Sequence, residues 1–356
     1  MDLFASSWMT RSLGEAVSAI RLGSKGGVYA GGWNGCVKSW TKDGTLEWAA
    51  ALPDRVTVLH RHGDDLFATA GLHVVCIDAV NGALRWSHPL EGSADTLAVF
   101  NGALYAVSSV YDIEHNDFLE SAVWNFSFDG RLNWVHRMDE RPWVTLEHDG
   151  ELLFGLGRPK SGFSNITGET TSTHVTTEAD SPITSGSATS SNLFFGHADG
   201  SVSNREGATV CVLEDAIEHI IATEKECIAT LDNGATVVLR NGKKVWAIEG
   251  ERVSVQAMGF TMNDEQTLWT GRWSGSQGAI QIHSAASGHL LLDTPTERCE
   301  SIDADAERIA IGFEDGTVRV WEQVMFERRM RAEVSVEPKD ERKLALQDKL
   351  RALRDR

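Results

Sequence analysis

Side chains that could hold a cation gather in one segment of the sequence. Residues 109–120 contain five of them: Asp112, Glu114, His115, Asp117 and Glu120. Oxygen-rich loops bind Ca²⁺ when the ligands alternate at EF-hand spacing around an obligatory glycine. Both that spacing and that glycine are absent here. We therefore predict no metal in this segment and interpret it as an insertion that lengthens one repeat unit.

Histidine and cysteine spacings do not predict a metal site either. His60 and His62 form an HxH pair that strand alternation would aim at one face, but no third ligand follows at a diagnostic spacing. The five cysteines are scattered, odd in number and without a CxxC pair, which favours buried free thiols over a disulfide framework. The GxSxG, P-loop and HExxH motifs are also absent, so the sequence gives no positive sign of catalysis.

Acidic residues recur at intervals of 35 to 49 residues: Glu15, Asp54, Glu91, Asp139 with Glu140, Asp180, Asp215, Glu251 and Glu297. An arginine follows directly in four of these segments: Arg55, Arg141, Arg252 and Arg298. The acids form either an electronegative platform for a basic peptide or cation, or a set of solvated turns, because acids are ordinary turn residues. The arginines would screen this charge or tie the loops down by local pairing.

Larger side chains lie beside glycine-rich turns: Trp33 in GGWNG, Arg158 in GLGRP, His197 in GHADG, and Arg272 with Trp273 in GRWSG. Exposed aromatic and arginine side chains dominate the binding energy of protein interfaces. Packing between repeat units is the alternative role for most of the twelve tryptophans. Trp33 and Trp273 lie next to turns, so we prefer them as contact residues.

A recurring hexapeptide shows which elements must position these residues. Four close copies are DGTLEW at 43–48, NGALRW at 81–86, DGRLNW at 129–134 and NGKKVW at 241–246. Weaker copies are ITGETTST at 166–173, EGATVC at 206–211 and SGHLLL at 287–292. Their glycines lie 35 to 48 residues apart, which is the length of a β-propeller blade.

Each unit contains four strands. The Asp-Gly or Asn-Gly pair favours a tight turn, the Trp ends a strand, and two alternating apolar strands precede them. Innermost strands are expected to begin near Val17, Val56, Ala94, Trp143, Ile183, Ile217, Val253 and Cys299. The sequence therefore predicts an all-β fold over residues 1–324: an eight-bladed β-propeller of four-stranded antiparallel blades, whose outer-to-inner connections share one face with the turns named above.

The last unit lacks a fourth strand of its own. Trp8 precedes Val17 by nine residues, much as Trp48 precedes Val56 by eight. The N-terminal strand is therefore expected to complete and close the last blade, because an open ring would leave an unpaired edge.

The segment from Ser161 to Ser191 is about half Ser and Thr. It is either a mobile, modifiable loop or a degenerate outer strand, since Thr-rich strands pair well at a sheet edge. The second interpretation is the simpler one.

The hexapeptide repeat resembles that of the pyrroloquinoline-quinone-like (quinoprotein alcohol dehydrogenase-like) propellers, and EDGTVRVW at 314–321 resembles a WD40 blade. The resemblance covers residues 1 to about 324 and implies architecture more than function. Catalytic members of that superfamily hold the quinone and a calcium ion, and its alcohol dehydrogenases carry a vicinal Cys-Cys pair. No such pair occurs here. The resemblance therefore favours a relative without catalytic activity or cofactor.

Residues 325–356 form a basic C-terminal extension. From residue 327 onward, ten Lys and Arg stand against seven acids. Pro338 ends a strand-like stretch, and a short amphipathic helix is expected over 338–356, with Leu346, Leu350 and Leu353 on one stripe. So short a helix needs a partner surface: the propeller, a second copy or another protein.

The net charge of −18 disfavours nucleic acid as a partner, and no apolar run is long enough to enter a membrane. The N-terminal residues lack the features of a secretory signal, so a cytoplasmic location is expected. The sequence predicts a non-catalytic scaffold that binds protein partners through its loops and C-terminal helix. Basic proteins are among the partners that an acidic loop face would suit. The alternative is an oxidoreductase that binds a quinone or small ligand in the central funnel.

Overall fold

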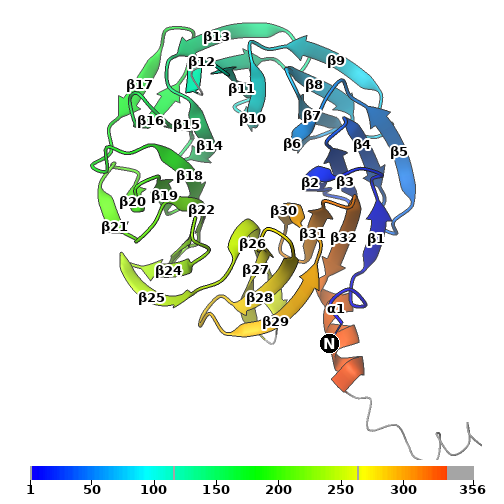
Figure 1. Cartoon of the computed structure of the whole chain (residues 1–356). Helices are drawn as coiled ribbons and strands as arrows, with labels where there is room; N and C mark the ends of the chain where they lie inside the picture. The colour runs from blue at the N-terminus through cyan, green and yellow to red at the C-terminus, as the bar shows by residue number, and fades with distance from the viewer. Residues whose placement is uncertain (1, 115–116, 263, 335–356) are drawn as a thin grey trace, which may run out of the picture.

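The chain folds into a ring of eight sheets around a central opening (Figure 1). The computed structural model describes residues 2–114, 117–262 and 264–334. Within these residues each sheet contains four antiparallel strands, and neighbouring strands along the chain pair with each other. The predicted eight-bladed β-propeller is confirmed. We number the blades 1 to 8 in chain order, starting with the blade that contains β2.

The innermost strands are β2 (Val17–Leu22), β6 (Val56–His62), β10 (Ser93–Phe100), β14 (Pro142–His148), β18 (Ile183–Ala188), β22 (Ile217–Ala222), β26 (Arg252–Met262) and β30 (Cys299–Ala304). The second strands are β3 (Val28–Gly32), β7 (Asp65–Ala70), β11 (Ala103–Asp112), β15 (Glu151–Leu156), β19 (Leu193–His197), β23 (Cys227–Leu231), β27 (Glu265–Trp273) and β31 (Arg308–Phe313). The third strands are β4 (Cys36–Trp40), β8 (His73–Asp78), β12 (Asp117–Phe126), β16 (Gly162–Ile166), β20 (Ser201–Asn204), β24 (Thr236–Arg240), β28 (Gly278–Ser284) and β32 (Thr317–Glu322). The outermost strands are β5 (Leu46–Ala51), β9 (Leu84–Pro89), β13 (Leu132–Met138), β17 (Ser172–Val175), β21 (Thr209–Val212), β25 (Lys243–Ile248), β29 (Leu290–Thr296) and β1 (Met9–Ser12).

Blade 8 takes its outermost strand from the N-terminus, as the sequence predicts. Strand β1 pairs antiparallel with β32, from Met9 opposite Val320 to Ser12 opposite Thr317. The residues ahead of β1 add to this closure, because the Trp321 indole donates a hydrogen bond to the Leu3 carbonyl at 3.0 Å. An N-terminal strand and the last three strands of the described chain therefore share one sheet, which closes the ring.

The repeated hexapeptide joins neighbouring blades. The indole N–H of Trp48 in blade 1 donates to the Ala79 carbonyl of blade 2 at 3.1 Å. Gly82, in the turn that follows, has a φ of 77° and lies beneath that indole, where an added Cβ would come within 2.6 Å of the ring. Glycine is required there for two reasons: the turn needs a positive φ, and the indole leaves no space for a Cβ atom. The glycine of one blade thus receives the tryptophan of the blade before it.

A second set of contacts joins the blades near the channel. Every innermost strand has a register shift close to its first residue. Such bulges re-aim the extra side chain. Ser18, Thr184 and Ser254 occupy bulge positions, and each hydroxyl donates to a backbone carbonyl at the start of the next innermost strand.

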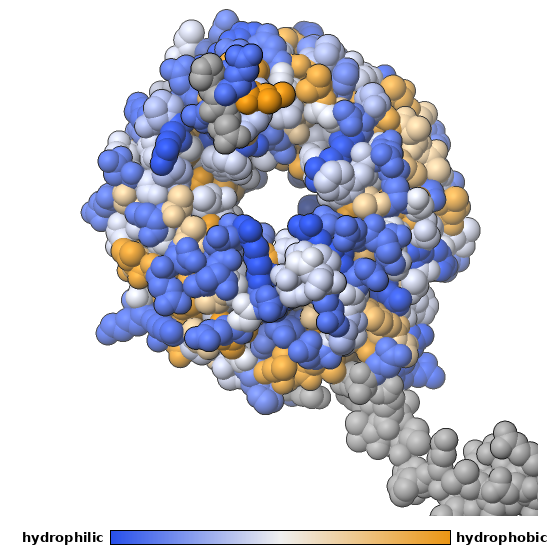
Figure 2. Space-filling view, in the orientation of Figure 1, coloured by the Kyte–Doolittle hydropathy of each residue, from blue (hydrophilic) through white to orange (hydrophobic). Residues whose placement is uncertain are grey.

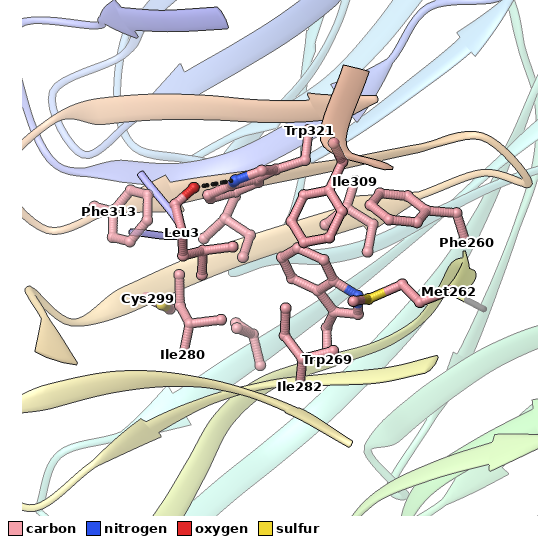
Figure 3. Packing of buried hydrophobic residues seen from close by; sticks show 13 residues of the cluster. Leu3, Phe260, Met262, Trp269, Ile280, Ile282, Cys299, Ile309, Phe313 and Trp321 are labelled. Carbon is pink, nitrogen blue, oxygen red and sulfur yellow. Dashed lines mark hydrogen bonds between the residues drawn. The ribbon is translucent and has the colours of Figure 1, made fainter. Parts of the chain in front are cut away.

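Blades 7 and 8 enclose an aromatic cluster that also anchors helix α1 (Gln323–Val334) (Figure 3). Phe326 of α1 is fully buried, and its ring centroid lies 5.4 Å from that of Phe260. The sequence treated the stretch before Pro338 as strand-like, which is wrong for its described part, because α1 continues to Val334. The Glu, Arg, Met and Gln residues there are good helix formers. The helix predicted over 338–356 lies outside the described residues.

The Ser- and Thr-rich segment forms regular strands. Residues 161–191 supply β16 and β17 of blade 4 and β18 of blade 5. Strand β17 pairs with β16 from Ser172 opposite Ile166 to Val175 opposite Phe163. The interpretation as a degenerate outer strand is therefore confirmed, and the alternative of a mobile loop is wrong.

Candidate functional site

The candidate acids and the candidate turn residues share one face of the ring. Each outer-to-inner connection lies beside a turn between second and third strands, as shown by hydrogen bonds from Leu52 N to Gly35 O and from Gly157 N to Arg141 O, both 2.8 Å. We call this surface, made of the outer-to-inner connections and the turns between second and third strands, the loop face. The space-filling view in Figure 2 shows a largely hydrophilic surface around the open centre.

The candidate acids differ in exposure. Among the acids in the outer-to-inner connections, Glu140 is half-buried, whereas Asp54, Glu91, Glu251 and Glu297 are exposed. A negatively charged rim therefore exists on the loop face. Its role in binding stays a prediction.

Some of these acids serve the turns themselves. Glu15 accepts hydrogen bonds from the backbone N–H groups of Asn34 and Cys36 at 2.9 and 3.1 Å. Glu91 pairs with Arg137 at 2.6 Å, and this arginine lowers the pKa of the Glu91 carboxyl. Both interpretations of the acids thus apply, to different residues.

Arginines of the loop face lie over aromatic rings, and two of them lie over the predicted contact residues. The guanidinium carbon of Arg55 lies 3.5 Å from the centroid of the Trp33 ring, and that of Arg298 lies 5.8 Å from the Trp273 ring. Trp33 is 43% exposed, whereas Trp273 is half-buried. The arginine holds each ring in one orientation at small entropic cost, which suits a binding surface.

Local pairing also fixes the arginines, as predicted. Arg141 pairs with Asp95 of the preceding innermost strand at 3.2 Å. Arg252 pairs with Glu218 at 2.9 Å and with Asp232 at 2.7 Å. These contacts tie neighbouring blades together and neutralise part of the rim.

Two predicted contact residues are buried and cannot contact a partner, which corrects the sequence analysis. His197 is fully buried, and its ring nitrogens contact the Ser181 carbonyl at 2.9 Å and the Ser203 hydroxyl at 2.8 Å. Arg272 is 2% exposed and donates to the carbonyls of Gly234 and Glu251 at 2.8 and 2.6 Å. A position beside a turn did not predict exposure here, because both polar side chains point inward and form hydrogen bonds with backbone carbonyls.

Arg158, another of the predicted turn residues, is exposed and lines a cavity of about 980 Å³ on the loop face. One wall is the long hairpin β11–β12, and the opposite wall comes from the connections that enter blades 4 and 5. Trp143, which is 45% exposed, contributes to the floor. Sequence reasoning missed Trp143 as a contact residue, although its place next to the Glu140-Arg141 pair was a usable signal.

Arg141 lies between two rings in this cavity. Its guanidinium carbon is 3.8 Å from the centroid of Phe118 and 3.9 Å from that of Trp143. Burial lowers the pKa of Arg141, while Asp95 opposes that shift. The charged stack is therefore held by both aromatic and ionic contacts.

The described residues contain no group of three or more His, Cys, Asp or Glu that could hold a metal ion. His115 lies outside the described residues. All five cysteines are free. Burial raises the pKa of the Cys227 and Cys299 thiols to about 12, so both are neutral, unreactive thiols near neutral pH.

The predicted tail contacts Leu346, Leu350 and Leu353 lie outside the described residues. Helix α1, which precedes them, begins at the end of β32 on the face opposite the loop face. Arg329 of α1 donates to the carbonyl oxygens of Ala5 and Ser7 at 3.0 and 2.5 Å. The two ends of the described chain therefore lie side by side, as Figure 1 shows.

Several solved structures of very different sequence are similar to this fold. Sqt1 of Saccharomyces cerevisiae superposes with a TM-score of 0.71 at 13% identity, over 89% of this chain and 98% of that one. BamB of Moraxella catarrhalis gives 0.70 at 15% identity, over 89% and 99%. The WD40 β-propeller domain of Doa1 gives 0.54 at 13% identity, over 89% and 96%.

At these identities the likeness shows the fold alone. No protein-family model matches the chain, and no curated protein is significantly similar to it. The WD40-type resemblance of the repeat agrees with these neighbours, whereas the resemblance to quinone-binding propellers is not confirmed. Among the described helices, none has the length and apolar character needed to cross a membrane.

Proposed function

We propose that this protein is a non-catalytic scaffold that binds partner proteins on its loop face. The observation that carries the proposal is the pair of exposed tryptophans, Trp33 and Trp143, each stacked against an arginine on the loop face. Tryptophan and arginine are the residue types that contribute most binding energy at protein interfaces. The structural comparisons do not favour the alternative of a quinone-dependent oxidoreductase.

Affinity capture with quantitative mass spectrometry tests this proposal. The wild-type protein is compared with the double variant Trp33→Ala/Trp143→Ala and with Val80→Ala, whose exposed side chain lies on the opposite face. We expect the double variant to lose captured partners by at least about 30-fold, the loss associated with a hot-spot residue of about 2 kcal/mol. Val80→Ala should keep them. Partners that bind all three proteins equally would contradict a role for the loop face.

We also propose a reducing, cytoplasmic location. Five free cysteines, three of them buried, suit a compartment where thiols stay reduced. Cell fractionation with thiol labelling of the native protein checks this. Recovery in an oxidising compartment would overturn it.

A further inference from the structure

The cavity between the hairpin β11–β12 and blades 4 and 5 breaks the regular pattern of the ring. Both strands of this hairpin have ten residues, longer than most equivalent strands. The longer hairpin of blade 3 therefore gives one side of the loop face a wall that most other blades lack. We call the space behind it the hairpin pocket; its volume is about 980 Å³.

Four aspartates from separate parts of the chain line the hairpin pocket: Asp117, Asp139, Asp180 and Asp199. All four are exposed. In the described part of the chain no Lys or Arg lies within ion-pair distance of any of them. Arg158 and Arg141 also line the pocket, but Arg141 is already paired with Asp95, so four carboxylates stand against the one remaining guanidinium of Arg158. This excess of negative charge would attract a cation to the pocket.

The floor of the pocket supplies a second kind of contact. The Trp143 ring is 45% exposed and is fixed by Arg141 and Phe118. The positive charge of Arg141 is already matched by Asp95 at 3.2 Å. An aromatic ring beside carboxylates that have no ion-pair partner is the combination that recognises ammonium and guanidinium groups.

The hairpin that forms one wall of the pocket also exposes apolar side chains. Tyr111, Ile113 and Leu119 of the hairpin are 45%, 86% and 57% exposed. A free cation would use only the carboxylates, whereas a peptide could place its cationic side chain in the pocket and its apolar neighbours on the hairpin. The size of the pocket also exceeds what a single ion requires.

We infer that the hairpin pocket binds a lysine- or arginine-bearing segment of a partner protein, with the cation among Asp117, Asp139, Asp180 and Asp199 and beside Trp143. This inference rests on the proposed scaffold function and specifies the chemistry of its partner. The exposed carboxylates supply long-range attraction, and the ring and hairpin supply short-range contact.

Fluorescence anisotropy of labelled oligolysine and oligoarginine peptides tests the inference, with oligoglutamate as the negative probe. The pocket variant is Asp180→Asn/Asp199→Asn. The matched control is Asp64→Asn/Asp149→Asn on the opposite face, which changes net charge equally; Asp149 shares the left-handed φ of Asp180, 54° against 47°. Asparagine tolerates this conformation, so both variants should fold.

We expect the pocket variant to weaken binding of the basic peptides by about tenfold or more, and the control by less than about twofold. Trp143→Leu should weaken binding as well while leaving net charge unchanged. Equal weakening in the pocket variant and the control would assign binding to bulk charge and overturn the inference, as would wild-type protein that binds neither basic peptide.

The failure of the pocket inference can be distinguished from the failure of the scaffold proposal. If basic peptides do not bind but partner capture still depends on Trp33 and Trp143, the pocket inference is wrong and the scaffold proposal stands. If basic peptides bind the pocket but no partner is captured, the scaffold proposal fails by itself.

Discussion

At the scale of single residues, one buried histidine shows how the interior of the protein changes the pKa of a side chain. His283 is 4% exposed, and its Nδ1 atom has no hydrogen-bond partner. Burial lowers its pKa from the ordinary value of 6.5 to about 4; Arg272 and His289 add to this shift, and Asp293 opposes it. The imidazole is therefore neutral in the folded protein at neutral pH.

This burial predicts a specific loss of stability in acid. Between pH 6.5 and about 4, His283 binds a proton in the unfolded chain but not in the folded one. Unfolding therefore becomes more favourable as pH falls through this window, and the loss is complete below the lower value. Thermal melting at several pH values should show a smaller decrease in Tm for His283→Gln than for the wild type. The exposed His62→Gln should behave like the wild type; identical pH profiles for all three proteins would contradict the assignment.

At the scale of elements, the repeated hexapeptide explains why the fold could be predicted so closely. Its glycine and its tryptophan serve two different blade interfaces, and the four close copies keep both. Trp86 repeats the pattern of Trp48, donating to the Phe128 carbonyl at 2.8 Å above Gly130. The rule depends on local sequence, and the innermost strands begin within one residue of the predicted positions.

A pair of glycine variants measures this contact. Gly130 and Gly102 both have positive φ values, 88° and 75°, but a Cβ on Gly130 would lie 2.7 Å from the Trp86 ring, while nothing lies within 4 Å at Gly102. Gly102→Ala should lower the free energy of unfolding by about 1–2 kcal/mol through backbone strain. Gly130→Ala should cost about 1–3 kcal/mol more through overpacking. Chemical denaturation gives both values, and equal costs would show that the indole does not constrain the turn.

The candidate site was harder to predict for a physical reason. Turn patterns locate a residue on the loop face but do not fix the direction of its side chain. Trp33 and Arg158 point outward, whereas His197 and Arg272 turn inward to backbone carbonyls that only the folded ring brings near. The hairpin pocket depends on elements of three blades, so no local motif marks it.

At the scale of the whole molecule, one blade carries the closure of the ring. Blade 8 combines β1 from the N-terminus with β30 to β32, and α1 packs beside them. Leu3 and Phe326, near opposite ends of the described chain, enter the same core cluster with Trp269 and Trp321. Both ends of the described chain lie on the face opposite the loop face, so closure and the proposed binding surface are separated in space.

Deleting residues 1–13 should therefore destabilise the entire ring. The deletion removes the buried side chains of Leu3, Met9 and Leu13 and leaves the edge of β32 unpaired. Each fully buried apolar side chain contributes about 1.5–3 kcal/mol, so the total loss is comparable to the stability of a typical domain. Thermal melting should show a large decrease in Tm or a failure to fold.

A synthetic peptide of residues 1–13 added in trans should restore the transition, whereas a scrambled peptide should not, because only the native order places Leu3 against Trp321 while β1 pairs with β32. The milder variant Leu13→Ala should lower Tm without preventing folding, which keeps the test informative if the deletion does not fold. An unchanged Tm in the deleted protein would show that the ring does not depend on its N-terminal strand.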